Sequence, residues 1–241
     1  MRLPAIVFLV ALSGGFALPG AARADGTAQE HYDKAAELVQ AKKFADAQKE
    51  LEKAVAIDPK HVESQKVLAA LLKRDGKLEA AAKHLEAVLE VEPDDVKVRA
   101  ELGNTYATAA EKAAQDQILA TSTEKRDKLA GKAIEAYRKV LEKEPDFAPV
   151  IFNLGTMQSL TERWADAVTT FDAYVEKKPD DARGRFYDAQ ACDKANADLA
   201  KTIAAWEAYL PLGKADAKQK KDVAHAEARL KDLKKKQRAA K

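Results

Sequence analysis

The chain has 241 residues, with 41 basic and 39 acidic side chains and a formal net charge of +2 at neutral pH. This near balance of charge argues against a nucleic-acid-binding protein. The sequence has one cysteine, Cys192, which excludes an intramolecular disulfide framework, so a stable core has to come from the packing of secondary structure.

Residues 1–24 have the pattern of a secretory signal peptide. Arg2 precedes an apolar run from Leu3 to Leu18, and an Ala-Arg-Ala sequence that ends at Ala24 fits a signal-peptidase site. Glycines and prolines interrupt the run, so it is a poorer match to a membrane anchor, which needs roughly 20 unbroken apolar residues. No cysteine stands at this site for lipidation. We therefore expect cleavage near Ala24, no lipid anchor, and a periplasmic or secreted mature protein.

Four prolines set a regular spacing in the rest of the chain, because Pro59, Pro93, Pro145 and Pro179 lie 34, 52 and 34 residues apart. A fixed period of roughly 20–50 residues predicts stacked supersecondary units. Proline lacks the amide hydrogen and clashes with the preceding helical turn, so each proline is expected to follow the end of a helix. With proline at position 32, the units within residues 25–213 begin near residues 28, 62, 96, 148 and 182.

The units share one pattern of small and large side chains. Small residues at positions 8 and 20 let two helices approach closely, and a large residue at position 24 fills the space beside them. This pattern resembles the tetratricopeptide repeat (TPR), most closely in residues 151–179. The resemblance implies an all-α, right-handed α-solenoid of about five helical hairpins. Position 8 is Ala35, Ala69, Gly103, Gly155 and Ala189; position 20 is Ala47, Ala81, Ala133 and Ala167; position 24 is Leu51, Leu85, Tyr137 and Phe171.

The third unit is longer than the others by 18 residues, and the extra length lies within residues 107–132. The segment has no proline and is rich in helix-forming residues, so both helices of this hairpin are expected to be lengthened. We place the turn within residues 120–127, where hydroxyl side chains can cap the second helix. Two interpretations stay open: a tolerated surface insertion, or a projecting hairpin in which Ile118 and Leu119 contact a partner.

Residues 214–241 are predicted to form a basic C-terminal helix, since they hold 11 basic and 4 acidic side chains. Val223, Ala226, Leu230 and Leu233 make one apolar stripe at helical spacing. Terminal repeats of a solenoid need a cap with a polar outer face, and a helix of this kind suits that role.

Catalytic motifs are missing from the sequence. It has no Gly-rich phosphate loop, no HExxH motif and no nucleophile elbow. The histidines fall in separate units without the spacing of metal ligands, and the carboxylates are spread over expected helix surfaces. We therefore expect a protein that is not an enzyme and that has no cofactor and no metal site.

The resemblance implies a concave groove lined by the first helix of each unit. Aromatic rings beside amides in this groove suit an extended peptide or a partner helix. An alternative stays open for the two phenylalanines, which can instead pack between neighbouring units. Carried over by position, the groove residues are Tyr32, Lys66, Asn104, Phe152, Asn153, Arg183, Phe186 and Gln190.

Some relatives bind a peptide's terminal carboxylate through a two-carboxylate clamp of lysine, asparagine and arginine. The matching places here are Ala100, Asn104, Asn153, Arg183 and Tyr187, so two of the five clamp residues are lost. The pattern therefore does not favour carboxylate-clamp binding.

Together these features predict a periplasmic scaffold or adaptor that binds a protein or peptide partner in a cell-envelope complex, such as pilus, gliding-motility, secretion or division machinery. Nucleic acid is not an expected partner. The alternative function is an envelope tether, in which the basic C-terminal helix binds anionic lipid or a cell-wall polymer and gives peripheral membrane contact.

Overall fold

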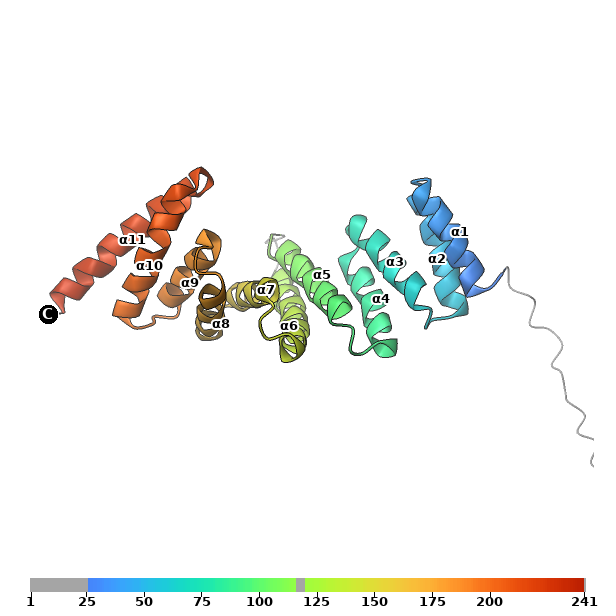
Figure 1. Ribbon diagram of the computed structural model, residues 1–241, viewed down its shortest axis with the longest axis horizontal. Coiled ribbons are helices and arrows are strands. Elements are labelled where there is room, and N and C mark those ends of the chain that lie inside the picture. Colours follow the sequence, from blue (N-terminus) through green and yellow to red (C-terminus); the bar gives the residue numbers. More distant parts are fainter. Residues whose placement is uncertain (1–25, 116–119, 241) are drawn as a thin grey trace, which may run out of the picture.

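The structure is a computed structural model that describes residues 26–115 and 120–240, and these residues form eleven α-helices and one short 3₁₀ helix. Successive helices pair as antiparallel hairpins that stack into an elongated row (Figure 1). The predicted all-α solenoid is therefore confirmed. The predicted signal peptide, Ile118 and Leu119 lie outside the described residues. The helices are α1 (Ala28–Gln40), α2 (Phe44–Ile57), α3 (Val62–Arg74), α4 (Leu78–Val91), α5 (Val96–Gln115), α6 (Ala120–Lys143), α7 (Ala148–Leu160), α8 (Trp164–Lys177), α9 (Ala182–Lys194), α10 (Leu199–Ala215), η1 (Ala217–Gln219) and α11 (Lys220–Ala239).

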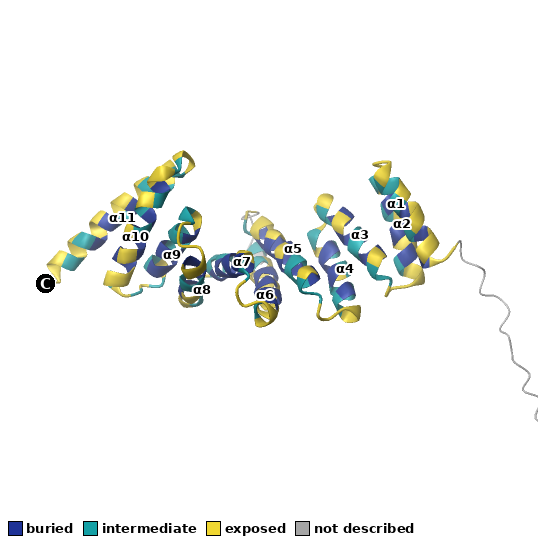
Figure 2. Ribbon diagram, in the orientation of Figure 1, coloured by how far each residue is buried: buried dark blue, intermediate teal, exposed yellow. Residues whose placement is uncertain are grey.

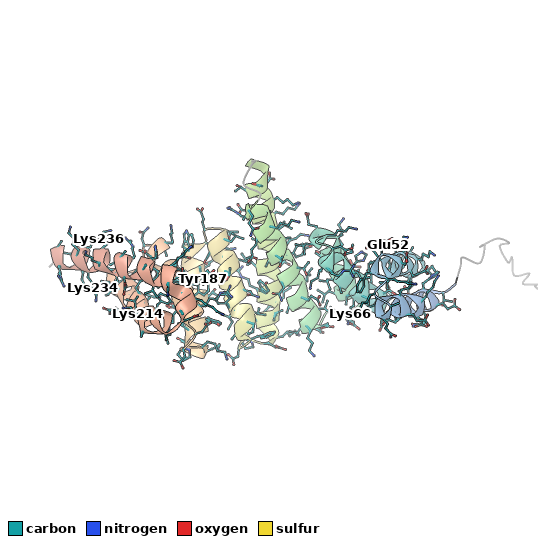
Figure 3. All side chains as sticks on the ribbon, turned by 90° about the horizontal axis from the view of Figure 1, so that it is seen from above. Glu52, Lys66, Tyr187, Lys214, Lys234 and Lys236 are labelled. Carbon is teal, nitrogen blue, oxygen red and sulfur yellow. The ribbon has the colours of Figure 1, made fainter. Side chains whose placement is uncertain are left out.

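The third hairpin, α5 and α6, is longer than its neighbours. Its helices have 20 and 24 residues, whereas α3 and α7 have 13 each and α4 and α8 have 14 each. The hairpin consequently projects beyond the rest of the solenoid (Figure 3). The turn expected within residues 120–127 is wrong, because α6 already begins at Ala120. Hydroxyl residues cap a helix only where the backbone leaves the helical conformation, and the helix formers after them continue the helix here.

Close contacts between small and large residues join the two helices of a hairpin. A Cβ atom on Gly103 of α5 would lie 2.6 Å from Cε1 of Tyr137 on α6. A Cβ atom on Gly155 of α7 would lie 2.7 Å from Cζ of Phe171 on α8. Both distances are shorter than van der Waals contact, so glycine allows the aromatic ring to approach the facing helix this closely.

The chain between hairpins is held by hydrogen bonds on both sides of the proline. Asp95 accepts a bond of 3.0 Å from the backbone N–H of Val98 and so caps α5. The carbonyl oxygen of Pro179 accepts a bond of 3.1 Å from Nε of Arg185, and that of Pro59 accepts one of 2.7 Å from Nε2 of Gln65. The side chain of the fourth residue of a unit, Arg185 or Gln65, therefore holds the proline at the end of the preceding unit.

The turn inside each of four hairpins contains one residue in the left-handed region, always at position 15 of the unit. Lys42 and Glu162 have φ of 58°, Asn196 has 50° and Gly76 has 74°. Glycine adopts this conformation freely and asparagine tolerates it, whereas lysine and glutamate are strained there. Two of the four turns thus carry a residue that the backbone conformation does not favour.

Buried residues occur along the row of helices (Figure 2). Their apolar side chains form two cores that share one helix. The first core extends from α1 to α7 and includes Val150, Leu154 and Met157 of α7. The second core extends from α7 to α11 and includes Ile151 and Phe152 on the other side of α7. Helix α7 is buried on both sides, because its apolar residues are not confined to one face. No helix of the described residues combines the length and apolarity needed to cross a bilayer.

The C-terminal helix covers the open end of the last hairpin. Helix α10 continues past Pro211 to Ala215, and η1 turns the chain back so that α11 packs along α10. The side chains of Ala226, Leu230 and Leu233 are buried in this contact. Burial of this stripe removes the apolar end of the second core from water.

Candidate functional site

A pocket of about 250 Å³ opens in the middle of the solenoid, between helices of the third, fourth and fifth hairpins. It contains four of the eight groove residues predicted from the sequence, namely Asn104, Phe152, Asn153 and Arg183. The full lining is Asn104, Ala107, Thr108 and Glu111 of α5, Tyr137 of α6, Phe152, Asn153, Thr156 and Met157 of α7, and Arg183 of α9.

Two amides from different hairpins meet in this pocket. Oδ1 of Asn104 accepts a hydrogen bond of 2.9 Å from Nδ2 of Asn153 and another of 2.8 Å from the hydroxyl of Tyr137. Burial raises the pKa of Tyr137 well above its ordinary value, so its hydroxyl stays protonated and keeps donating. The two amides are thereby fixed in place, while Nδ2 of Asn104 and Oδ1 of Asn153 keep their hydrogen-bonding capacity for a ligand.

Arg183 forms one side of the pocket by stacking on aromatic rings. Its guanidinium carbon lies 4.6 Å from the ring centre of Phe152 and 5.8 Å from that of Tyr187. Among the described residues no carboxylate lies within ion-pair distance of Arg183. A guanidinium that lies over an aromatic ring keeps its N–H groups in its own plane, where they can donate to a carboxylate or carbonyl of a partner.

Phe152 is only 7% exposed, because two rings of its own hairpin and one ring of the next hairpin surround it. Its ring centre lies 5.2 Å from Tyr174, 5.4 Å from Tyr187 and 5.9 Å from Phe171. The phenylalanine therefore packs between units and contributes one apolar wall of the pocket through the part of its ring that stays accessible.

The other four predicted groove residues do not line this pocket. Lys66 forms ion pairs with Glu92 at 2.8 Å and Asp95 at 3.3 Å, and the hydrogen bond to Glu92 raises its pKa. Phe186 packs between Tyr209, at 5.3 Å, and Trp206, at 5.6 Å.

Tyr32 and Gln190 lie on the first and last of the five hairpins, away from the pocket. The Tyr32 ring lies 5.6 Å from that of His61, and Gln190 is half-buried on α9. Of the eight predicted groove residues, four therefore line this pocket, around Asn104 and Asn153, and the other four lie elsewhere along the solenoid.

Sequence reasoning missed Thr108, Glu111 and Tyr137 as lining residues. Asn104, Thr108 and Glu111 stand at helical spacing along one face of α5, a signal that the sequence does contain. Glu111 lies in the lengthened part of α5, so it brings a carboxylate to the pocket that the shorter first helices have no position for. The pocket therefore presents one cation and one anion beside its amides.

A second, larger cleft of about 550 Å³ lies between α4 and the projecting part of α6. Two ion pairs cross the cleft: Lys125 with Glu79 at 2.6 Å, and Lys132 with Glu86 at 3.4 Å. The hydroxyl of Tyr106 donates to Glu86 at 2.6 Å and accepts from Lys132 at 2.8 Å. These groups satisfy one another, whereas Lys83, Glu124 and Lys128 of the lining take no part in these contacts.

A buried polar pair lies inside the first hairpin. Nδ1 of His31 is 2.7 Å from Oε2 of Glu50, and Lys34 and Lys53 each lie 3.1 Å from Oε1 of the same carboxylate. The hydrogen bond with His31, followed by those from the lysines, lowers the pKa of Glu50 from 4.5 to about 2. No metal-binding cluster of three or more His, Cys, Asp or Glu side chains occurs in the described part of the chain. The pair is a structural link between α1 and α2.

The sequence model described as "Tetratricopeptide repeat" matches residues 38–100 and 126–191 of the chain. The chain belongs to the tetratricopeptide repeat family. A TPR domain is a scaffold for protein–protein interaction, and its fold is typically non-catalytic. No curated protein matches this TPR chain in sequence.

Solved structures of MamA share the fold of this TPR protein. A crystal structure of MamA is 14% identical, with a TM-score of 0.60 over 80% of this chain and 95% of that one. A MamA AMB-1 structure is 21% identical, with a TM-score of 0.58 over 79% of this chain and 93% of that one. MamA from Desulfovibrio magneticus RS-1 is 12% identical, with a TM-score of 0.58 over 80% and 97%. At these identities the likeness establishes the TPR solenoid and nothing further.

Proposed function

We propose that this protein is a non-enzymatic adaptor that holds a protein or peptide partner in the central pocket. The observation that carries the proposal is the convergence of free polar groups there: Nδ2 of Asn104, Oδ1 of Asn153 and the unpaired guanidinium of Arg183 all border one apolar wall, Phe152. Membership of the TPR family supports a protein partner.

The size and chemistry of the pocket favour a segment of polypeptide as the ligand. A volume of about 250 Å³ is below the roughly 300–1,000 Å³ of pockets that enclose a small molecule, so it suits one or two side chains and the backbone beside them. An amide donor next to an amide acceptor can bind both groups of a peptide unit. Arg183 adds a preference for a carboxylate or carbonyl at one end of the pocket.

The proposed location is the periplasm or the outside of the cell, and the proposed setting is a cell-envelope complex. The pattern of residues 1–24 supports export, since a short basic start, an apolar run and Ala24 fit a cleaved signal peptide. Mass spectrometry of the protein purified from its native cell tests this. A mature chain that starts at Asp25 supports export, and an uncleaved chain in the cytoplasm overturns it.

Photo-crosslinking in the native cell tests the pocket. A photoreactive residue replaces Thr156, which lines the pocket, and in a matched control it replaces the exposed Ala56 of α2. The proposal expects one protein to be captured from position 156 and not from position 56, and expects Arg183→Glu to abolish the capture. Equal capture from both positions, or capture that Arg183→Glu leaves unchanged, would overturn it.

A further inference from the structure

Helix α11 is fixed to the solenoid through one face. Its apolar stripe is buried against α10, and ion pairs hold its flanks. Arg229 donates two hydrogen bonds of 2.6 Å to Asp193 of α9, and Lys234 lies 2.6 Å from Glu207 of α10. The helix therefore has no free apolar face with which to enter a membrane or a partner's core.

The opposite face of α11 is strongly basic. Six of its cations are exposed, and no carboxylate of the described chain lies within ion-pair distance of any of them. The exposed acidic side chains of α11 are Asp232 and Glu227, and Glu227 pairs with Lys214 at 2.7 Å. Ala224 and Ala228 are the small residues between the cations. We call this surface the outer basic face; it consists of Lys220, Lys221, Lys231, Lys235, Lys236 and Arg238. Lys236 is labelled near the free end of α11 in Figure 3.

The shape and composition of the outer basic face indicate the class of its partner. The cations extend from Lys220 to Arg238 along a straight helix, a distance of roughly 27 Å at about 1.5 Å per residue. Helix α11 stands at one end of the row, and no other helix of residues 26–115 and 120–240 lies beyond it (Figure 1). A specific protein interface has aromatic or apolar anchors at its centre, and lysine is depleted there. This face has lysines and alanines instead, which suits a diffuse and planar negative charge.

We infer that the outer basic face of α11 binds the surface of an anionic lipid bilayer. The binding is electrostatic, with the lysine ammonium groups close to the lipid phosphates and the helix lying on the headgroups without entering the hydrocarbon. The outer basic face and the central pocket share no residue, so this inference does not depend on the proposed partner site. A bilayer bound at this end holds the TPR solenoid by its last helix.

Vesicle co-sedimentation of the mature full-length protein tests the inference. The vesicles are phosphatidylglycerol mixed with phosphatidylcholine, and pure phosphatidylcholine is the neutral control. The expected result is binding to the anionic vesicles alone, and a clear loss of binding when salt is raised from about 50 mM to about 300 mM. Absence of binding to the anionic vesicles, or binding that salt does not weaken, would overturn the inference.

A matched pair of triple variants then tests the face itself. One protein carries Lys231→Gln, Lys235→Gln and Arg238→Gln. The other loses the same charge through substitution of exposed, unpaired lysines outside α11, namely Lys60→Gln, Lys97→Gln and Lys178→Gln.

Each cation near an anionic surface contributes roughly a fivefold factor in binding, so the α11 variant is expected to lose roughly 100-fold and the control far less. Equal losses in the two variants would mean that net charge alone drives adsorption, which contradicts the inference. If the protein binds a soluble acidic polymer such as polyglutamate and does not bind vesicles, the partner of the outer basic face is a polymer, and the inference of a bilayer is overturned. The six substituted side chains in the two variants are exposed and unpaired, so the circular dichroism spectra of both variants should match that of the parent. The salt series on the unsubstituted protein tests the inference even if a variant fails to fold.

Discussion

Asn153 donates a hydrogen bond of 2.9 Å to Asn104, although the two residues belong to successive hairpins. The same oxygen of Asn104 accepts from Tyr137, which lies across the third hairpin. One side-chain carbonyl thus connects three helices and sets the position of the amide beside it. The pocket is built on a contact between units, and no single hairpin contains it.

Replacement of Asn104 by aspartate should separate folding from binding. Asn104→Asp keeps an oxygen that accepts from Tyr137 and Asn153 but removes the Nδ2 donor, so the free energy of unfolding should change by less than about 1 kcal/mol, while crosslinking from position 156 should weaken about tenfold. Asn104→Leu removes the acceptor and should cost about 1–3 kcal/mol. Urea denaturation and crosslinking yield measure the two effects. If Asn104→Asp crosslinks from position 156 as efficiently as the parent, the Nδ2 donor of Asn104 does not contribute to partner binding.

Two glycines on the third hairpin should respond in opposite directions to alanine. Gly103→Ala places a Cβ atom against Tyr137 and should lower the free energy of unfolding by about 1–3 kcal/mol. Gly131→Ala meets no atom within 4 Å on an exposed position of α6 and should raise it by about 0.5–1 kcal/mol, because alanine favours the helix. Thermal unfolding of both variants checks this, and destabilisation of similar size in both would contradict the packing described.

Glu50 should make the first hairpin sensitive to acid. Its folded pKa of about 2 lies below the ordinary value of 4.5, so the ionised form contributes stability that is complete above pH 4.5 and is lost as the pH falls toward 2. The variant Glu50→Gln should be less stable than the parent by on the order of 2 kcal/mol at about pH 6, and this difference should shrink at about pH 3.

Urea denaturation at the two pH values measures the difference for Glu50→Gln. The control is Glu52→Gln, an exposed glutamate on the same helix that lies outside the cluster of His31 and Glu50. A difference between Glu50→Gln and the parent that does not depend on pH would show that the carboxylate is not held in its ionised form.

The strained turn at Glu162 should be relieved by glycine. Its φ of 58° is unfavourable for an L-residue, so Glu162→Gly should raise the free energy of unfolding by about 0.5–1 kcal/mol. Gly76→Ala, at the same place in the second hairpin, should lower it by about 1 kcal/mol through the backbone alone, since its Cβ atom would meet nothing. Asn196→Gly should have little effect, because asparagine tolerates this region. Differential scanning calorimetry ranks the three variants, and a loss of stability in Glu162→Gly would refute the assignment of strain.

Arg229 should control how firmly α11 stays docked. The variant Arg229→Ala removes both hydrogen bonds to Asp193 and leaves that carboxylate partly buried, so docking should weaken by about 1.5–3 kcal/mol. Hydrogen exchange should then accelerate in residues 220–239 more than in α3 or α4. Lys231→Ala, which removes an exposed and unpaired cation of the same helix, should leave the exchange unchanged. Unaltered exchange in Arg229→Ala would mean that apolar burial alone fixes the helix.

The sequence predicted the architecture because its signals are local. Each proline ends one helix, and the small residue at Gly103 and the large one at Tyr137 act within one hairpin. The repetition of these local signals predicts the solenoid that the structure confirms. The start of α6 was misplaced because hydroxyl residues suit both a cap and a helix interior, and the neighbouring residues favour the helix.

The site was less predictable because it depends on contacts between units. Position in the repeat places Phe152 on the groove side, but whether its ring is exposed depends on Arg183 and Tyr187 of the next hairpin, which cover it. The bond between Asn104 and Asn153 likewise depends on the rotation of one hairpin against the next. The repeat pattern carries no information about that rotation. It therefore predicted which residues lie on the groove side but not which of them contact one another.

The sharing of α7 by both apolar cores determines how the solenoid comes apart. Loss of the hairpins on either side strips one face of α7 and leaves the other face, with Leu154 or with Ile151, still buried in the remaining core. Unravelling that starts at one terminus therefore reaches a helix that the far half continues to hold. Under mechanical load the protein is expected to yield in two steps, with α7 as the boundary between two cooperative blocks.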